Sequence, residues 1–175
     1  MILCPVQNTA VLKTGWVQQR PRITQVFGVN PQVYSQFGLK GHDGIDLGIP
    51  VGTPLFSPIE GTIKLKDTGD KGYGLHIRIR GGGKEVILGH MSKVLVQDGA
   101  HVKMGQSLGL SGNTGFSTGP HLHFGLRYIE EGNKTQPDLY LWTVKDYNNG
   151  FFGYVDPLPY MITWKGTLLD DNLKS

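Results

Sequence analysis

The sequence predicts one mainly β domain, in which a larger antiparallel sheet and a smaller partner sheet are joined by large loops. Glycine accounts for 26 of the 175 residues, about twice its usual share, and it recurs every several residues without a strict triplet period. With 38% apolar residues, this composition indicates many short strands joined by tight turns, and it fits neither collagen nor a disordered chain. No segment shows a sustained apolar period of 3.6 residues, so no long helix is predicted.

The clearest strands are expected in the middle of the chain. Residues 74–80 alternate between apolar and polar side chains, which puts the polar ones, His76 among them, on an exposed face. The three glycines that follow predict a tight turn into a strand at 85–90, and hence a hairpin. His101 is expected to lie in an exposed turn. Further short strands are expected at 62–66, 98–104 and 106–111.

The compact domain is predicted at residues 23–165. Residues 1–22 are expected to form an N-terminal arm, because they show no clear period and end in an Arg-Pro-Arg sequence typical of a hinge. Residues 166–175 are expected to be a surface tail. Residues 129–154 are interpreted as an insertion within the domain.

Charge and composition exclude several classes of protein. The net charge is +3 and no run of lysines and arginines forms a basic stripe, so a nucleic-acid partner is not expected, although the charge suits an anionic surface such as a cell wall. Cys4 is the only cysteine, which excludes an intrachain disulfide and a cysteine metal cluster. No apolar run reaches 18 residues, so no membrane insertion is expected.

The first 11 residues do not resemble a secretory signal, because they lack a basic segment and a sustained apolar stretch. Two expectations follow. Either the numbering starts from a new methionine on a mature form, or the protein leaves its cell by a route other than a cleaved signal.

Two histidines one residue apart, His121 and His123, stand in the run from Gly119 to Arg127. On a strand, side chains at i and i+2 share a face, so both imidazoles point the same way. They can then serve one metal site, either as two ligands or as one ligand and one neighbour of the bound water. The alternative is a pair of surface histidines on an edge strand.

A second motif, His42 and Asp46 four residues apart, lies between glycines that disfavour a helix. On a strand, His42, Gly44 and Asp46 share a face, and Gly44 leaves open space between two candidate ligands. Asp43 would point the opposite way, towards solvent. The alternative interpretation is a simple His/Asp hydrogen bond at a strand end.

With His90 at the end of the 85–90 strand, the chain has five side chains suited to one metal-dependent site. Zinc hydrolases use three protein ligands of the N/O type and leave a fourth position for water, and His, Asp, His is such a set. Two histidines then remain to accept a proton from the water and to support the oxyanion and leaving amine. This chemistry leaves open which of His121 and His123 binds the metal.

Together these motifs resemble the lysostaphin/LytM-type zinc endopeptidases of peptidoglycan. The similarity rests on His-x-Gly-x-Asp at 42–46, Gly-His-Met at 89–91 and the run from 111 to 124, and it extends over 23–128 and 155–160. The resemblance implies a LytM-like fold and one Zn²⁺ per chain. It also implies that the polar loop of Asn113, Thr114, Ser117 and Thr118 borders the substrate groove; the alternative is that these residues simply form turns.

The resemblance further assigns the site. It implies that the metal ligands are His42, Asp46 and His123, and that the catalytic residues are His90 and His121. Relatives hold the oxyanion with a tyrosine, a position that Tyr34 could fill.

The insertion at 129–154 departs from the family pattern, in which a brief turn follows the His-x-His strand. Two interpretations stay open: the insertion packs its aromatic side chains on the main sheet, or it forms a wall of the groove and narrows the choice of substrate. The aromatic residues concerned are Tyr140, Trp142, Tyr147, Phe151, Phe152 and Tyr154.

We therefore expect a zinc metalloendopeptidase that hydrolyses cross-links or stem-peptide bonds of peptidoglycan at the bacterial cell wall, outside the cell or in the periplasm. Two alternatives are a non-catalytic wall-binding or amidase-activating module and a phage-tail component that carries the peptidase. The second alternative adds phage virion or lysis proteins as candidate partners, and the single-domain size suits a phage lysin. A lipoyl-type carrier is disfavoured, because the hairpin around Lys84 lacks the setting of a modified lysine. The sequence leaves open which bond is cleaved.

Overall fold

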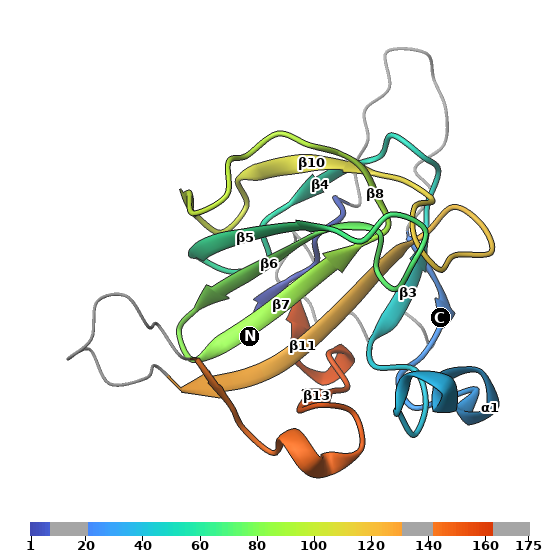
Figure 1. Ribbon diagram of the computed structural model, residues 1–175. Helices are drawn as coiled ribbons and strands as arrows, with labels where there is room; N and C mark the ends of the chain where they lie inside the picture. The colour runs from blue at the N-terminus through green and yellow to red at the C-terminus, as the bar shows by residue number, and fades with distance from the viewer. Residues whose placement is uncertain (8–20, 131–141, 163–175) are drawn as a thin grey trace.

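The computed structural model describes residues 1–7, 21–130 and 142–162 (Figure 1). These residues form strands joined by loops and by a few short helical turns, and no helix among them is long and apolar enough to cross a membrane. The strands are β1 (Ile2–Leu3), β2 (Arg22–Gln25), β3 (Ile45–Gly48), β4 (Pro54–Phe56), β5 (Gly61–Asp67), β6 (Leu75–Gly81), β7 (Lys84–Gly89), β8 (Met91–Val94), β9 (His101–Val102), β10 (Ser107–Ser111), β11 (Leu122–Glu130), β12 (Thr143–Val144), β13 (Tyr154–Val155) and β14 (Met161–Ile162). The helical turns are α1 (Pro31–Tyr34), η1 (Ser35–Phe37), η2 (Tyr147–Asn149) and η3 (Leu158–Tyr160).

The main sheet has the strand order β2-β3-β11-β7-β6-β5-β9, and all its pairings are antiparallel. Figure 1 shows β5, β6, β7, β11 and β3 side by side across the molecule. The predicted hairpin is confirmed: β6 and β7 pair in register from Ile77 with Leu88 to Gly81 with Lys84. Gly82 and Gly83 both adopt positive φ angles, as a tight hairpin turn of this twist requires.

A smaller sheet of order β4-β10-β8 packs with the main sheet around one apolar core, and β1 pairs with β14 in a separate parallel ribbon. Leu55, Met91 and Leu108 from the smaller sheet and Ile77 and Phe124 from the main sheet are fully buried in this cluster. Burying such side chains supplies most of the stabilisation of a domain of this size. The predicted class, a larger and a smaller antiparallel sheet with large loops, is confirmed.

Strand β11 organises the site because its two edges meet different parts of the chain. One edge pairs with β7 from His123 to Tyr128, which places His123 opposite Gly89 and next to His90. The other edge pairs first with β3, so that His123 lies opposite Asp46, and then with β13 and β12. Three motifs that are distant in the sequence therefore meet at the start of β11.

Parts of the predicted domain division fall outside the described residues. Residues 8–20 of the arm, residues 131–141 of the insertion with Tyr140, and the tail at 166–175 lie there. The described start of the arm belongs to the core: Ile2, Cys4 and Val6 are buried in the apolar cluster. The division at 23–165 stays a prediction.

Two expectations about exposure were wrong. His76 is buried because the loop at 68–74 turns back over it, with the Tyr73 ring centroid 5.5 Å from its own, and its Nδ1 donates to the Gly74 carbonyl. Asp43 is buried because the chain becomes a strand only at Ile45, so the alternation of a strand does not extend back to it. His101 is exposed, as predicted.

Candidate metal centre and active site

Three side chains from two distant parts of the chain converge at the start of β11. His42 Nε2 lies 3.0 Å from His123 Nδ1, and Asp46 Oδ1 lies 3.1 Å from the former and 3.3 Å from the latter. All three side chains are buried. A zinc ion bound tetrahedrally by N and O ligands at about 2.0–2.1 Å keeps its ligand atoms roughly 3.3 Å apart. The donor atoms therefore fit one zinc ion in number, type and spacing.

The local backbone explains why the two imidazoles present these nitrogens. His42 Nδ1 faces the Val26 carbonyl at 3.1 Å, and a carbonyl can only accept, so Nδ1 carries the proton and Nε2 has a free lone pair. Gly44 makes room for the other ring, because a Cβ there would lie 2.8 Å from His123 Cε1 and 2.4 Å from the Phe124 carbonyl oxygen. Glycine at this position is therefore a steric requirement of the cluster.

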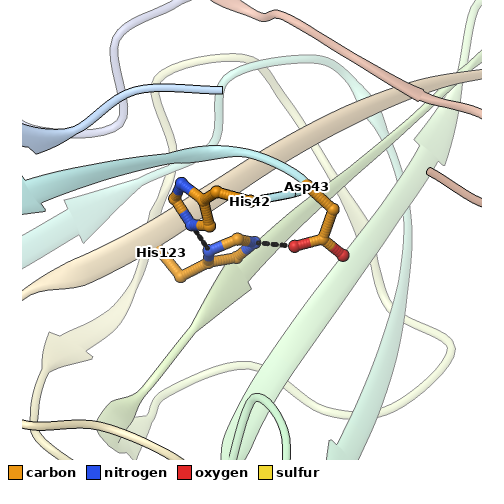
Figure 2. A group of neighbouring side chains, drawn as sticks. All are labelled: His42, Asp43 and His123. Atoms are coloured by element: carbon orange, nitrogen blue, oxygen red, sulfur yellow. Dashed lines mark hydrogen bonds and ion pairs between the residues drawn. The ribbon is translucent and has the colours of Figure 1, made fainter. Parts of the chain in front are cut away.

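Asp43 brings a second carboxylate to the same cluster. Figure 2 shows the His123 ring between His42 and Asp43, with one ring nitrogen towards each. Asp43 Oδ1 lies 3.6 Å from His123 Nε2, and its Oδ2 accepts a hydrogen bond from the Tyr73 hydroxyl. His42, Asp43 and His123 each offer a donor atom within 4.8 Å of the other two, so Asp43 is a rival candidate ligand.

The two carboxylates differ in the nitrogens that they face. Asp46 Oδ1 is within 3.3 Å of the two nitrogens that face each other, whereas Asp43 lies beside the opposite nitrogen of His123. A carboxylate that accepts from the second nitrogen of a metal-binding histidine fixes its tautomer and orientation. His123 Nε2 has no other partner among the described residues, which suits this arrangement.

His90 and His121 lie together beside the cluster, with ring centroids 4.5 Å apart. Nδ1 of His90 donates to the Thr114 carbonyl at 2.6 Å, and Nδ1 of His121 donates to the Gly119 carbonyl at 2.7 Å. Each imidazole is thereby fixed in the tautomer that leaves Nε2 free. Nε2 of His121 lies 3.6 Å from Asp46 Oδ2, so it faces the predicted metal ligands.

The backbone at His90 has a left-handed φ of 60°, uncommon for a residue with a side chain. This conformation turns the chain from β7 into β8, and the His90 N–H donates to the Tyr73 carbonyl at 2.8 Å. Such a conformation costs free energy and persists only where the surrounding structure holds it in place. Residues of this kind are concentrated at functional sites.

Burial and neighbouring charges set the protonation states of the cluster. Burial opposes ionisation of Asp46, but hydrogen bonds from His123 and His42, and their charges, hold the pKa of its carboxyl well below the usual range. Burial, together with His123 and His121, lowers the pKa of His90 to about 4. Near neutral pH, Asp46 is therefore a carboxylate and His90 a neutral imidazole.

The cluster opens into a cleft of about 710 Å³. Of the four polar loop residues, Ser117 and Thr118 line this cleft, next to Phe116, whereas Asn113 and Thr114 do not. That this loop borders the substrate groove stays a prediction. Phe37 and Phe116, both in the lining of the cleft, meet edge to face with centroids 5.3 Å apart. From the insertion, Tyr147, Phe152 and Tyr154 line the cleft, while Tyr154 also pairs with β11.

Tyr34 lies in the cleft with its ring centroid 5.2 Å from that of His42. Its hydroxyl accepts a hydrogen bond from Gln25 Nε2 at 2.7 Å. Burial and the charge of Asp46, opposed by this hydrogen bond, raise the pKa of Tyr34 to about 12. The hydroxyl therefore keeps its proton and can donate it to a ligand.

Sequence reasoning missed four residues around this site: Asp43, Tyr73, Arg78 and Arg127. For Arg127 a signal was present, because the period of two in β11 places it on the same face as His121 and His123. Arg78 likewise alternates with the apolar residues of β6. Nothing in the sequence pattern indicated that Tyr73, in a loop, would reach Asp43.

Comparison with known proteins agrees with this architecture: a mainly β fold with a buried His/Asp cluster in a cleft. A family model, Peptidase family M23, matches residues 40–137, more than half of the chain. The chain belongs to this family, as its resemblance to lysostaphin/LytM-type peptidases predicted.

Individual relatives cover the same region. The peptidoglycan DD-endopeptidase ShyA of Vibrio cholerae is 41% identical over 87 residues, which are 49% of this chain and 20% of that protein. The glycyl-glycine endopeptidase ALE-1 of Staphylococcus capitis is 37% identical over 114 residues, 58% of this chain and 29% of that protein. The chain therefore spans less than a third of the length of these curated relatives.

Solved structures show the same fold. Lysostaphin from Staphylococcus simulans superposes with a TM-score of 0.58 at 27% identity, covering 80% of this chain and 48% of that one. The catalytic domain of the prophage-encoded M23 protein EnpA from Enterococcus faecalis, solved as a point mutant, gives a TM-score of 0.54 at 32% identity, covering 71% of this chain and 95% of that one.

Proposed function

We propose that this protein is a zinc metalloendopeptidase that hydrolyses peptide bonds of bacterial peptidoglycan. The observation that carries the proposal is the convergence of His42 Nε2, Asp46 Oδ1 and His123 Nδ1 within 3.3 Å of one another, with the Nε2 atoms of His90 and His121 left free beside them. The name of ShyA, a peptidoglycan DD-endopeptidase, supports peptidoglycan as the substrate, and the name of ALE-1, a glycyl-glycine endopeptidase, supports cleavage of peptide bonds.

In this proposal His42, Asp46 and His123 hold one zinc ion per chain. Bound there, zinc would polarise the scissile carbonyl and make water nucleophilic near neutral pH. His90 and His121 share the remaining chemistry: one Nε2 accepts the proton of the attacking water and passes it on to the leaving amine, and the other supports the oxyanion once its own Nε2 is protonated. The carbonyls that accept from their Nδ1 atoms keep both rings in the tautomer needed.

The wall of the cleft supplies the remaining functions. The Tyr34 hydroxyl is a neutral donor beside His42 and can stabilise the developing oxyanion. The aromatic rings of Phe37 and Phe116 add an apolar surface to the lining of the cleft, against which a peptide could pack. In this proposal the buried groups around the cluster lower the local dielectric. The Tyr34 hydroxyl would therefore stabilise the charge of the oxyanion more strongly than water does.

The test is digestion of purified peptidoglycans that differ in their cross-links, followed by mass spectrometry of the released fragments. New amino termini at one type of bond would establish the endopeptidase and identify that bond. His42→Ala and Asp46→Ala are expected to lose both tight zinc binding and product release. His101→Ala is the matched control, because His101 is exposed and lies outside the cleft.

Absence of release by protein with zinc bound would contradict the proposal and support a non-catalytic wall-binding or amidase-activating module. The same chemistry would serve a cellular enzyme acting outside the cell or in the periplasm, a phage lysin, or a lysin carried in a phage particle. Detection of the protein in purified virions distinguishes the last of these.

A further inference from the structure

Three arginines surround a single buried glutamate on the face of the main sheet that carries His123, and they have no part in the chemistry above. Glu85 Oε1 accepts from Arg78 Nη1 at 2.8 Å and from Arg127 Nε at 2.8 Å, and Oε2 accepts from Arg80 Nε at 2.5 Å. The register explains the cluster, because Glu85 in β7 lies directly between Arg80 of β6 and Arg127 of β11.

The charges in this cluster do not balance. The single carboxylate of Glu85, which is almost fully buried, forms ion pairs with three guanidinium groups. Two positive charges therefore remain unbalanced. Arg78 and Arg127 line the cleft, and Arg80 does not. Apart from the metal cluster and its histidines, no other charged side chain among the described residues lines the cleft. A zinc ion bound as proposed would offset the two carboxylates of Asp43 and Asp46, and the two arginines would then leave the cleft positive.

Both cleft arginines are held in place before any ligand arrives. Arg78 Nη1 donates to the Tyr154 hydroxyl at 2.8 Å, and its Cζ lies 5.7 Å from the Tyr73 ring centroid. Arg127 Cζ lies 5.1 Å from the Tyr154 ring centroid. Fixing the side chains in advance reduces the entropy that binding would otherwise cost. Guanidinium groups presented in this way match the planar geometry of a carboxylate.

The arginines lie at a distance from the metal cluster that a peptide substrate can span. Arg127 is four residues along β11 from His123 on the same face, roughly 13 Å at about 3.3 Å per residue. Arg78 is nearer, because only the Tyr73 ring separates it from His123, with the Tyr73 and His123 centroids 5.0 Å apart. An extended substrate bound at the metal would place a group two to four residues from the scissile bond beside them.

We propose that Arg78 and Arg127 form a subsite that binds a free carboxylate of the substrate, and that the preferred substrate is therefore an anionic stem peptide. This inference rests on the proposed function and names its substrate class. Diaminopimelate-containing peptides retain free carboxylates after cross-linking, whereas oligoglycine bridges have none. Glu85 and Tyr154 are positioning residues for the two arginines.

The first experiment uses the zinc-loaded wild-type protein and needs no variant. Its substrates are a pentaglycine-linked peptide and two synthetic stem-peptide dimers joined by a D-alanyl–diaminopimelate bond. In one dimer the stem that supplies the D-alanyl carbonyl has free carboxylates, and in the other it has carboxamides in their place, while the carboxylate beside the scissile nitrogen is kept in both. The charge-assisted hydrogen bonds predict a kcat/KM about 10- to 100-fold higher for the free acid than for the amide. Equal values for acid and amide, or preferred cleavage of pentaglycine, would overturn the inference and leave the proposed function intact.

The second experiment assigns the preference to residues. In Arg78→Gln and Arg127→Gln the acid-to-amide ratio is expected to fall towards one, mainly through KM, with zinc content unchanged. Arg80→Gln is the matched control, because it removes a contact to the same glutamate from outside the cleft, and the ratio should persist. A ratio that survives in both cleft variants would overturn the assignment. No cleavage of any peptide with zinc bound would instead contradict the proposed function itself.

Discussion

Replacing Asp43 with asparagine distinguishes the two carboxylates that lie beside the metal-binding histidines. If Asp46 is the ligand, Asp43 acts only through His123, whose Nε2 lies 3.6 Å from Asp43 Oδ1. An asparagine can keep an acceptor oxygen near Nε2 but loses the negative charge that makes the ring a stronger ligand. The Tyr73 hydroxyl keeps a partner in the variant, so the fold should be retained.

The expected loss of zinc affinity follows from this geometry. Changing a group that orients a ligand typically weakens metal binding by about 10- to 100-fold. That corresponds to about 1.4 to 2.8 kcal/mol. Asp46→Asn is expected to weaken binding much further, because it removes one of the three converging donor atoms. Tyr73→Phe, which removes only the hydrogen bond to Asp43, should have the smallest effect of the three.

The measurement is competition for zinc with a chelator of known affinity, on the purified variants, with no activity assay involved. Circular dichroism of each apo protein shows whether the variant is folded. The reasoning predicts the order Asp46→Asn, Asp43→Asn, Tyr73→Phe from the largest loss to the smallest. If Asp43→Asn loses as much zinc affinity as Asp46→Asn or more, Asp43 is a direct ligand and the assignment is wrong.

Three other variants test separate parts of the site. His121→Ala should bind zinc as the wild type does and lose peptide cleavage, measured by zinc content and by product release; loss of the metal would refute its catalytic role. Gly44→Ala should lower both zinc affinity and the melting temperature, at a cost of about 1–3 kcal/mol for forced displacement, while Gly119→Ala, whose Cβ meets nothing within 4 Å, should change neither. Tyr147→Ala should raise KM because Tyr147 lines the cleft, whereas Tyr160→Ala, outside it, should not.

The sequence predicted the elements that depend on local pattern. The hairpin of β6 and β7 followed from clean alternation and a glycine turn, and the structure confirms it. The placement of His42, Asp46 and His123 around one point needed the spacing of the motifs together with a known family, because i, i+2 spacing alone left both His121 and His123 as candidate ligands. In the structure, Nδ1 of His123 lies 3.0 Å from Nε2 of His42, whereas Nδ1 of His121 donates to the Gly119 carbonyl.

What the sequence could not predict depends on contacts between distant segments. His76 belongs to a clean alternating strand, and only the loop carrying Tyr73 makes its polar face a buried one. Asp43 was assigned to solvent by a strand expected to include His42, but the strand begins three residues later, at Ile45. The arginine cluster around Glu85 depends on register between three strands, which no single segment encodes.

The insertion at 129–154 illustrates how packing and specificity can come from the same residues. Its described part adds β12 and β13 to the edge of β11 beyond β3, so it does pack on the main sheet. Its residues also complete the arginine subsite, because the Tyr154 hydroxyl accepts from Arg78 and the Phe152 carbonyl accepts from Arg127 at 3.5 Å. The two interpretations of the insertion are therefore compatible, and both follow from one attachment to β11. If the carboxylate subsite is correct, Tyr154→Phe should reduce the acid-to-amide preference without changing zinc affinity, since it removes a support of Arg78 and no metal ligand.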